Sequence, residues 1–221
     1  MTAAVPGVSK LSGNNGYYIP SGSGRAEYEE KRSRFIAYLD TVESEEEAKA
    51  FIAAVKKENH DARHNCWCYI LRNGPERYSD DGEPQGTAGI PMLEVFRHEE
   101  ITDVVCVVTR YFGGVLLGTG GLARAYTKAA KDALTDAGIS IVRKWMECSV
   151  ECPYPLYDRL RGEITSAGGI LSSVEYGKAV SVALLIPEET YGSFSKNISD
   201  VSSGSLELKL SGEAYRAVPI K

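Results

Sequence analysis

The chain has 221 residues, enough for one large domain or two small ones. Hydrophobic residues make up 43% and charged residues 25%, and no stretch approaches the ~18 apolar residues of a membrane span. The net charge of −5 argues against a dedicated nucleic-acid binder with a globally basic surface, although it leaves room for a local basic patch.

The first residues and the cysteines indicate the compartment of the protein. Residues 1–16 are rich in Gly, Ser and Asn, and they predict a flexible tail without the apolar core of a signal peptide. We therefore expect a soluble, cytoplasmic protein that does not enter a membrane. The five cysteines are an odd number without a disulfide spacing, and we expect free thiols, several of them buried. They are Cys66, Cys68, Cys106, Cys148 and Cys152.

Strand and helix signals alternate through the first part of the chain. The run Phe35–Leu39 predicts a strand, and Ser44 with Glu47 forms a capping box that predicts a helix after it. Cys66–Leu71 predicts a second strand, which a hairpin turn at Asn73-Gly74 follows.

Two helices and a buried strand are expected next. Residues 91–98 predict a short helix with a proline in its first turn. The uninterrupted apolar run Val104–Val108 predicts a strand that is buried on both faces. A longer helix is expected from about Gly121 to Asp136, and Gly138 ends it.

The pattern restarts at about residue 142, in the order βαββαβ that defines the split βαβ of ferredoxin-like domains. We therefore predict an α+β protein with two domains, residues 17–143 and residues 144–221. The expected elements of the second domain are strands that include 147–152, 174–176, 180–186 and 206–211, a helix opened by Pro155, and a weak helix over 188–199.

The glycine-rich segment from Arg110 to Gly121 is the strongest candidate for a binding site. Glycines let the backbone approach a ligand closely, and the N–H groups at the start of the following helix favour an anion. Arg110 could bind a phosphate or carboxylate in bidentate fashion. The alternative is that the glycines only permit tight packing between a strand and a helix. The candidate residues are Arg110, Tyr111, Gly113, Gly114, Gly118, Thr119, Gly120 and Gly121.

Three further groups of residues are candidates beside that segment. Arg124, Lys128 and Lys131 form a basic stripe on the following helix, although most charge runs of this kind are solvated faces. Asp80, Asp81 and Glu83 could bind Mg²⁺ or act as acid and base, but Asp, Gly and Pro are also the residues of an ordinary turn. Arg63 and His64 form a polar pair at the entrance of a strand.

Motifs for known chemistry are incomplete. Gly113 and Gly118 have Walker spacing, but Thr119-Gly120 stands where the Lys-Ser/Thr pair is needed. Residues 118–123 fit G-x-G-x-x-A, yet the next strand carries no acid for a ribose. His60, His64, Cys66 and Cys68 lack a standard zinc spacing, so we expect neither a metal nor a cofactor. The sequence contains no obvious set of nucleophile, His and acid, so it gives no positive case for an enzyme.

The chain contains four ordered motifs, Lys31–Ile36, Ala62–Trp67, Ser79–Gly89 and Arg110–Leu122. They resemble those of the YigZ/IMPACT family over roughly residues 17–141. The resemblance implies an IMPACT-type first domain, a β-α sandwich similar to domain IV of elongation factor G and to GHMP kinases. It also implies a ferredoxin-like second domain similar to domain V of that factor.

The resemblance implies a regulatory protein linked to translation, and without an enzyme motif we expect it to be non-enzymatic. It would bind RNA, a nucleotide or a ribosomal partner through the glycine-rich segment, Arg63, His64 and the loop from Asp80 to Gly86. An enzyme that acts on a phosphorylated small molecule at the same loop is the competing hypothesis, and a purely protein-binding adaptor is a third. An RNA complex would show steep salt dependence, whereas a kinase-like enzyme would need Mg²⁺.

Overall fold

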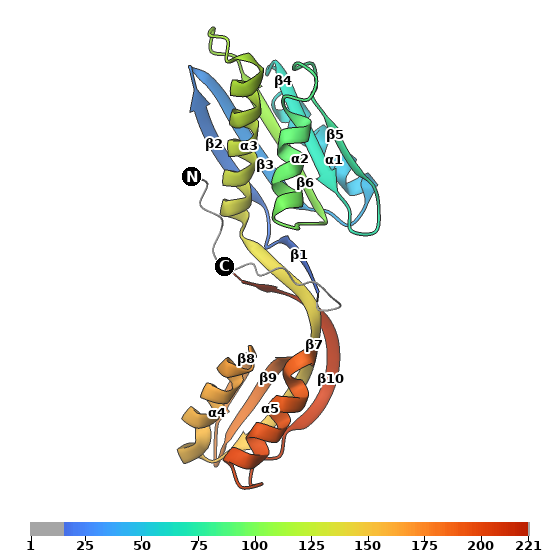
Figure 1. The fold of residues 1–221 in the computed structure, drawn as a ribbon. Coiled ribbons are helices and arrows are strands. Elements are labelled where there is room, and N and C mark those ends of the chain that lie inside the picture. Colours follow the sequence, from blue (N-terminus) through green and yellow to red (C-terminus); the bar gives the residue numbers. More distant parts are fainter. Residues whose placement is uncertain (1–15, 221) are drawn as a thin grey trace. The chain divides into compact units, whose positions relative to one another are not determined.

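The computed structural model describes residues 16–220, so the tail predicted for residues 1–16 lies almost entirely outside the described residues. The fold is α+β with two domains, as predicted. Within the described residues, one compact unit contains residues 17–141 together with 217–220, and the other contains residues 142–216. Figure 1 shows the elements of each unit in chain order.

The first unit is built on a five-stranded antiparallel sheet. Its order is β2 (Gly24–Glu30), β3 (Ser33–Thr41), β6 (Val104–Tyr111), β4 (His64–Ile70) and β5 (Glu76–Ser79). The central strand β6 is buried from its first residue through Arg110, which confirms the prediction for Val104–Val108. Its neighbours place Phe35 of β3 and His64 of β4 on either side of Arg110.

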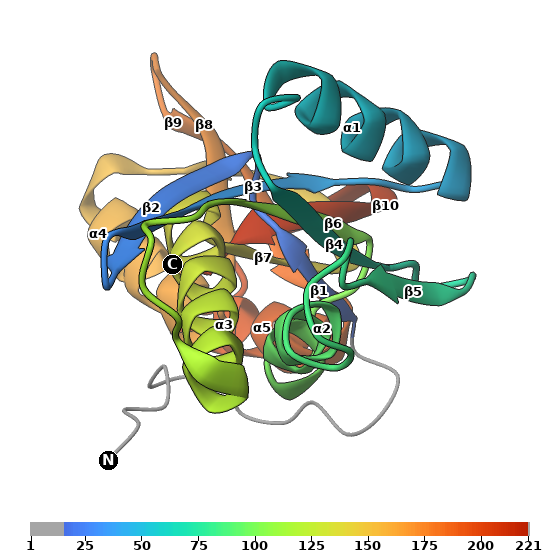
Figure 2. The same cartoon turned by 90° about the horizontal axis from the view of Figure 1, so that it is seen from above.

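Helices cover both faces of this sheet, and Figure 2 shows α1 (Glu45–Glu58) on the opposite side from the other two. Ser44 caps α1 by accepting a hydrogen bond from the Glu47 N–H at 3.2 Å, as the sequence predicts. On the other face, α2 (Gly89–His98) and α3 (Gly118–Ala137) pack over the larger core. A short strand, β1 (Tyr17–Pro20), forms a parallel bridge from Tyr18 to Ile101.

The start of α3 differs from the prediction. The helix begins at Gly118 rather than near Gly121, although glycine has a low helix propensity. The side chains of Leu117 and Leu122 pack on the sheet core and hold this first turn in place. Gly118, Thr119 and Gly120 therefore belong to the helix, and their N–H groups are those that lack an acceptor within it.

The second unit has the predicted order βαββαβ. Strand β10 pairs with β7, β7 with β9, and β9 with β8, which is the strand order of a ferredoxin-like sheet. The last strand begins at Lys209 and runs to Pro219, so the range 206–211 predicted for it was too early. Its elements are β7 (Ile139–Cys152), α4 (Tyr154–Ser166), β8 (Ile170–Tyr176), β9 (Val180–Pro187), α5 (Glu188–Val201) and β10 (Lys209–Pro219).

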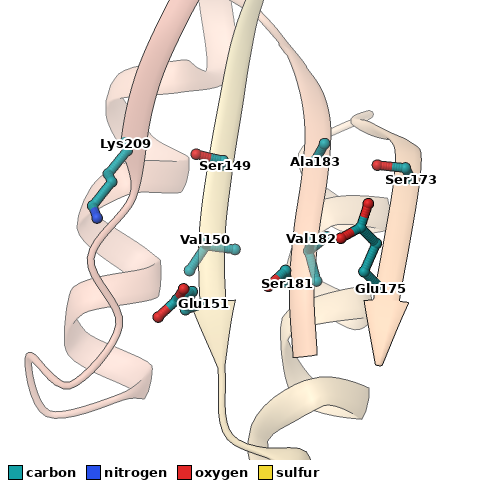
Figure 3. A pocket seen from close by; sticks show the side chains of 9 residues that line it. All are labelled: Ser149, Val150, Glu151, Ser173, Glu175, Ser181, Val182, Ala183 and Lys209. Atoms are coloured by element: carbon teal, nitrogen blue, oxygen red, sulfur yellow. The ribbon is translucent and has the colours of Figure 1, made fainter. Parts of the chain in front are cut away.

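One face of this second sheet is open. Figure 3 shows short polar side chains on it, among them Ser149, Ser173 and Ser181, with Glu151, Glu175 and Lys209 nearby. They surround a shallow depression of about 290 Å³. The apolar residues of the same strands, such as Val150 and Val182, are buried in the core with α4 and α5.

Candidate functional site

A pocket of about 330 Å³ lies in the first unit, where three separate segments of the chain meet. These segments are the entrance of β4, the loop between β5 and α2, and the stretch from the end of β6 into α3. The structure thus brings together Arg63, His64, Glu83, Arg110, Gly118 and Thr119 from the predicted site. The remaining lining residues are Gly82, Pro84, Phe112, Leu116, Leu117 and Leu122.

Arg110 is held inside the protein, and the carboxylate that it binds belongs to the protein itself. Its Nη1 donates to Glu83 Oε1 at 2.6 Å, and the two side chains are only 6% and 3% exposed. Tyr126 also donates to Glu83 Oε1, at 2.9 Å. Because a charged arginine and a charged glutamate neutralise each other here, Arg110 contributes less net charge to the pocket than its sequence position suggested.

One polar atom of Arg110 remains unsatisfied. Its Nη2 lies 3.4 Å from Ser33 Oγ, but its Nε is buried and has no hydrogen-bond partner among the described residues. Buried polar groups in folded proteins are nearly always hydrogen-bonded, so this donor is an exception, and it belongs to a residue that lines the pocket.

Asp80 has a structural role. Its Oδ1 accepts hydrogen bonds from the Ala88 and Gly89 N–H groups at 3.0 and 2.9 Å, and its Oδ2 accepts from the Gly86 N–H at 2.8 Å. The carboxylate therefore neutralises the N-terminal end of α2.

Asp81 points to different partners. Its Oδ1 lies 2.6 Å from Lys56 Nζ, and its Oδ2 accepts from the Asn65 N–H at 2.7 Å. Because Asp80 binds N–H groups at the start of α2 and Glu83 binds Arg110, the three acids do not converge on one point. No group of three or more His, Cys, Asp or Glu side chains among residues 16–220 could hold a metal ion.

His64 and Arg63 contribute to the pocket in different ways. The His64 Nδ1 lies 2.8 Å from the Asp81 carbonyl oxygen, which can only accept, so this nitrogen carries the proton. In the neutral ring the opposite nitrogen, Nε2, is then an acceptor. Arg63 is exposed, and its guanidinium carbon lies 5.6 Å from the centre of the Phe112 ring.

The first turn of α3 opens on this pocket without an acceptor of its own. Leu117 occupies the N-cap position, no side chain of residues 16–220 caps the helix, and its first turn holds no acidic residue. Gly118 has a φ of +71°, a left-handed conformation that favours glycine. The contrast with α2, where Asp80 supplies three acceptor contacts, shows that the chain leaves only the α3 end of this pair unneutralised.

The other predicted residues lie outside the pocket lining. Gly113 packs against the turn between β2 and β3, and Tyr111 donates to Asp61 Oδ1 at 3.1 Å. Gly114, Gly120 and Gly121 flank the pocket without lining it.

The basic stripe on α3 is weaker than predicted. Lys128 Nζ forms a salt bridge of 2.6 Å with Asp132, one turn further along the helix. Arg124 is exposed and Lys131 is partly buried, and neither lines the pocket. Of the predicted stripe, Arg124 and Lys131 therefore remain without a salt bridge to a described residue.

Sequence reasoning missed the apolar part of the site. Phe112 is 39% exposed and Leu116 is 81% exposed, although both are large hydrophobic residues. Exposed apolar residues on a glycine-flanked loop are a recognisable signal for contact with a ligand or partner, but periodicity analysis does not weigh residues between elements.

The fold and the pocket define a two-domain α+β protein with a partly apolar pocket in its first domain. Residues 31–134 match the Impact N-terminal domain, and residues 150–205 match a domain of unknown function, DUF1949. No helix among residues 16–220 is both long and apolar enough to cross a membrane.

Curated relatives give the same assignment. An IMPACT family member of Bacillus subtilis, YvyE, is 35% identical over 87% of this chain and 90% of its own length. The Escherichia coli member YigZ is 34% identical over 87% and 96%. A crystal structure of a hypothetical protein is similar with a TM-score of 0.56 and 33% identity, over 90% of this chain and 98% of that one. The chain belongs to the IMPACT family.

Proposed function

We propose that this protein is a non-enzymatic regulatory protein, linked to translation, that binds RNA or a nucleotide through a phosphate at the first turn of α3. The observation that carries the proposal is the uncapped start of α3, which opens on the same pocket as Arg63, His64 and Arg110. Free backbone N–H groups and the helix dipole favour a phosphate at such a position.

Two cationic groups support the phosphate in this proposal. Arg63 is exposed and makes no hydrogen bond or salt bridge with a described residue, so it is available to a ligand. Arg110 is fixed by Glu83 and Ser33, which leaves its Nε as the donor without a partner. A neutralised Lys128 and an overall charge of −5 argue for a local phosphate site rather than broad attraction to a polyanion.

The test compares two glycine-to-aspartate variants. A Cβ at Gly120 would lie 3.6 Å from Arg124 Nη1 and meet no other atom, so Gly120→Asp fits and places a carboxylate in the first turn of α3. Gly162→Asp is the control, because a Cβ there has open space on helix α4 of the other domain.

Titration of the full chain with single-stranded RNA and with nucleotide at low salt gives the readout. We expect Gly120→Asp to weaken binding at least tenfold and Gly162→Asp to leave it unchanged. For RNA, log affinity should fall against log salt with a slope of about −2 to −3, as for roughly three phosphate contacts. Binding that is absent at low salt, or equal in both variants, contradicts the proposal and favours the protein-adaptor hypothesis.

A further inference from the structure

We propose that the pocket contains a second subsite, formed by Phe112, Arg63 and Leu116, which stacks on the nucleobase of a ligand whose phosphate lies at the first turn of α3. This inference rests on the proposed function and names the chemical class of the ligand, a nucleoside 5′-phosphate unit. That unit has two sources, a free nucleotide or a residue of single-stranded RNA.

Phe112 has the features of a stacking platform. It follows β6 directly, is 39% exposed and lies on the pocket lining. The guanidinium carbon of Arg110 lies 5.5 Å from the ring centre, and that arginine is itself fixed by Glu83. The ring is therefore anchored from the protein side, where rigidity reduces the entropy lost on binding.

Arg63 can cover the opposite side of a stacked base. Its guanidinium carbon is 5.6 Å from the same ring, and no described residue holds it by a hydrogen bond or ion pair. A planar base that enters beside Phe112 would exchange one cation–π contact for stacking on both the ring and the guanidinium. Aromatic and arginine side chains together are the usual means of holding an unpaired base.

Leu116 extends the apolar surface beyond the ring. It is 81% exposed, and its neighbour Val115 is 40% exposed, on the loop that leads to Gly118. When an apolar ligand covers side chains of this kind, their removal from water stabilises the complex. Inorganic phosphate would leave them and Phe112 in water, whereas a purely apolar ligand would leave the N–H groups at the start of α3 without an acceptor.

The dimensions of the pocket agree with one nucleotide unit. Its volume of about 330 Å³ is at the lower end of the range for small-ligand sites, which are mostly apolar with a few polar groups that fix orientation. Its lining combines polar groups, at Thr119, Gly118 and the Arg110 guanidinium, with apolar ones at Phe112 and Leu116. This combination suits a ligand that has both an anionic group and a flat body.

The experiment removes the base from the ligand and the ring from the protein. The full chain is titrated at low salt by calorimetry with ribose 5-phosphate, AMP and a short single-stranded oligoadenylate. The variants are Phe112→Ala and, as a control, Tyr215→Ala, which removes an aromatic side chain that is 73% exposed in the second unit.

We expect AMP to bind about tenfold more tightly than ribose 5-phosphate, the gain typical of one stacked base. Phe112→Ala should abolish that ratio without changing the affinity for ribose 5-phosphate, and Tyr215→Ala should change neither. Oligoadenylate that binds more tightly than AMP identifies RNA as the source, and equal affinities identify a free nucleotide.

Two outcomes contradict the inference, and they differ from the failure of the proposed function. Equal binding of AMP and ribose 5-phosphate overturns the stacking subsite but retains the phosphate site. An AMP preference that survives Phe112→Ala also overturns the subsite. Absence of binding by all three ligands overturns the phosphate site and the stacking subsite together.

Discussion

The guanidinium of Arg110 and the carboxylate of Glu83 form an ion pair of 2.6 Å that joins the central strand β6 to the loop after β5. Tyr126 of α3 donates to the same carboxylate oxygen, so three elements meet at one buried anion. Desolvation raises the pKa of the Tyr126 hydroxyl well above its usual range, which keeps it a neutral donor. This arrangement holds the floor of the pocket in place.

Removal of either member of this pair should destabilise the protein strongly. Arg110→Ala leaves Glu83 as an uncompensated buried charge, and Glu83→Ala does the same for Arg110, so each should lower the free energy of unfolding by about 3–5 kcal/mol. The double variant should cost clearly less than the sum of the two. Urea unfolding measures all three.

An exposed pair is the matched control for that cycle. Arg34 and Glu27 form a salt bridge whose side chains are 50% and 47% exposed. Exposed pairs are screened by water, so Arg34→Ala and Glu27→Ala should change stability little and show little coupling. If the losses of unfolding free energy for Arg110→Ala and Glu83→Ala are additive in the double variant, the ion pair does not contribute to stability. The expected destabilisation also makes Arg110→Ala unsuitable as a test of ligand binding.

Asp80→Ala should destabilise the protein although the residue lies in a loop. The substitution removes the acceptor of the Gly86, Ala88 and Gly89 N–H groups, and we expect a loss of about 2 kcal/mol. Asp158→Ala, at an exposed position of α4, is the control and should be nearly neutral. Equal unfolding midpoints for the two variants would argue against a capping role for Asp80.

Gly113→Ala should also destabilise the protein, because the backbone there is too close to its neighbour for a side chain. A Cβ at Gly113 would overlap the backbone carbonyl group of Arg32, in the turn between β2 and β3. Overpacking of this kind costs about 1–3 kcal/mol. At Gly22 a Cβ has no neighbour within 4 Å, so Gly22→Ala should be tolerated. Denaturant unfolding of the two variants tests this prediction. Equal midpoints for Gly113→Ala and Gly22→Ala would contradict the expected clash.

The elements with strong periodic signals were predictable, and the weak ones were not. Residues 104–108 form an apolar run because β6 is central in the sheet and covered by helices on both faces. Strand β2 was missed because it lies at the edge and alternates charged, exposed residues such as Glu27 and Glu29 with partly buried ones. Half-exposed edge strands carry little hydrophobic signal.

The members of the site were predictable, but their pairing was not. Arg63, His64 and Arg110 come together because β4 and β6 are neighbours, with His64 opposite Arg110 in the register. Which acid neutralises Arg110 cannot be read from a chain with 30 acidic residues, since Glu83 meets it only through the path of a loop. Phe112 and Leu116 lie between β6 and α3, and a loop has no helical or strand periodicity from which the exposure of a residue can be predicted.

The buried thiols give the stability a predictable pH dependence. Desolvation raises the pKa of the Cys66 thiol to about 12, against about 8.5 in an unfolded chain. Between these values the unfolded state loses the proton and the folded state keeps it, so stability should fall as pH rises above about 8.5. Urea unfolding at pH 7.5 and 9.5 measures the loss, and Cys66→Ala should reduce it. The same loss in this variant would exclude Cys66 as its cause.

Reactivity with a thiol reagent offers a second readout. All five cysteines are free and buried, and burial also raises the pKa of the Cys148 thiol to about 11. In the native protein the thiolate fraction at pH 8 is therefore small. We expect slow reaction in buffer and rapid reaction of five thiols in denaturant. A thiol that reacts rapidly in the native state would contradict the burial of that residue.

The second domain should fold without the first. Its core residues, from Met146 to Leu206, all lie within residues 142–216, and the strands β7, β8, β9 and β10 form its ferredoxin-like order. We expect residues 142–216 alone to unfold cooperatively, with equal calorimetric and van't Hoff enthalpies. Strand β7 begins at Ile139 in the first unit, and Ile220 donates to the Ile139 carbonyl at 2.9 Å. The fragment therefore begins after Ile139 and ends before Ile220, which leaves the second core whole.

The full chain provides the matching test of independence. Gly113→Ala lies in the first unit and should lower the unfolding temperature of that unit alone. In a calorimetric scan we expect one transition to move and the other, assigned from the isolated fragment, to stay in place. A fragment that melts without cooperativity, or a variant that shifts both transitions equally, would show that the two units form a single folding unit. In that case the two units would have mostly separate contacts on either side of residue 142 but would unfold together in one transition.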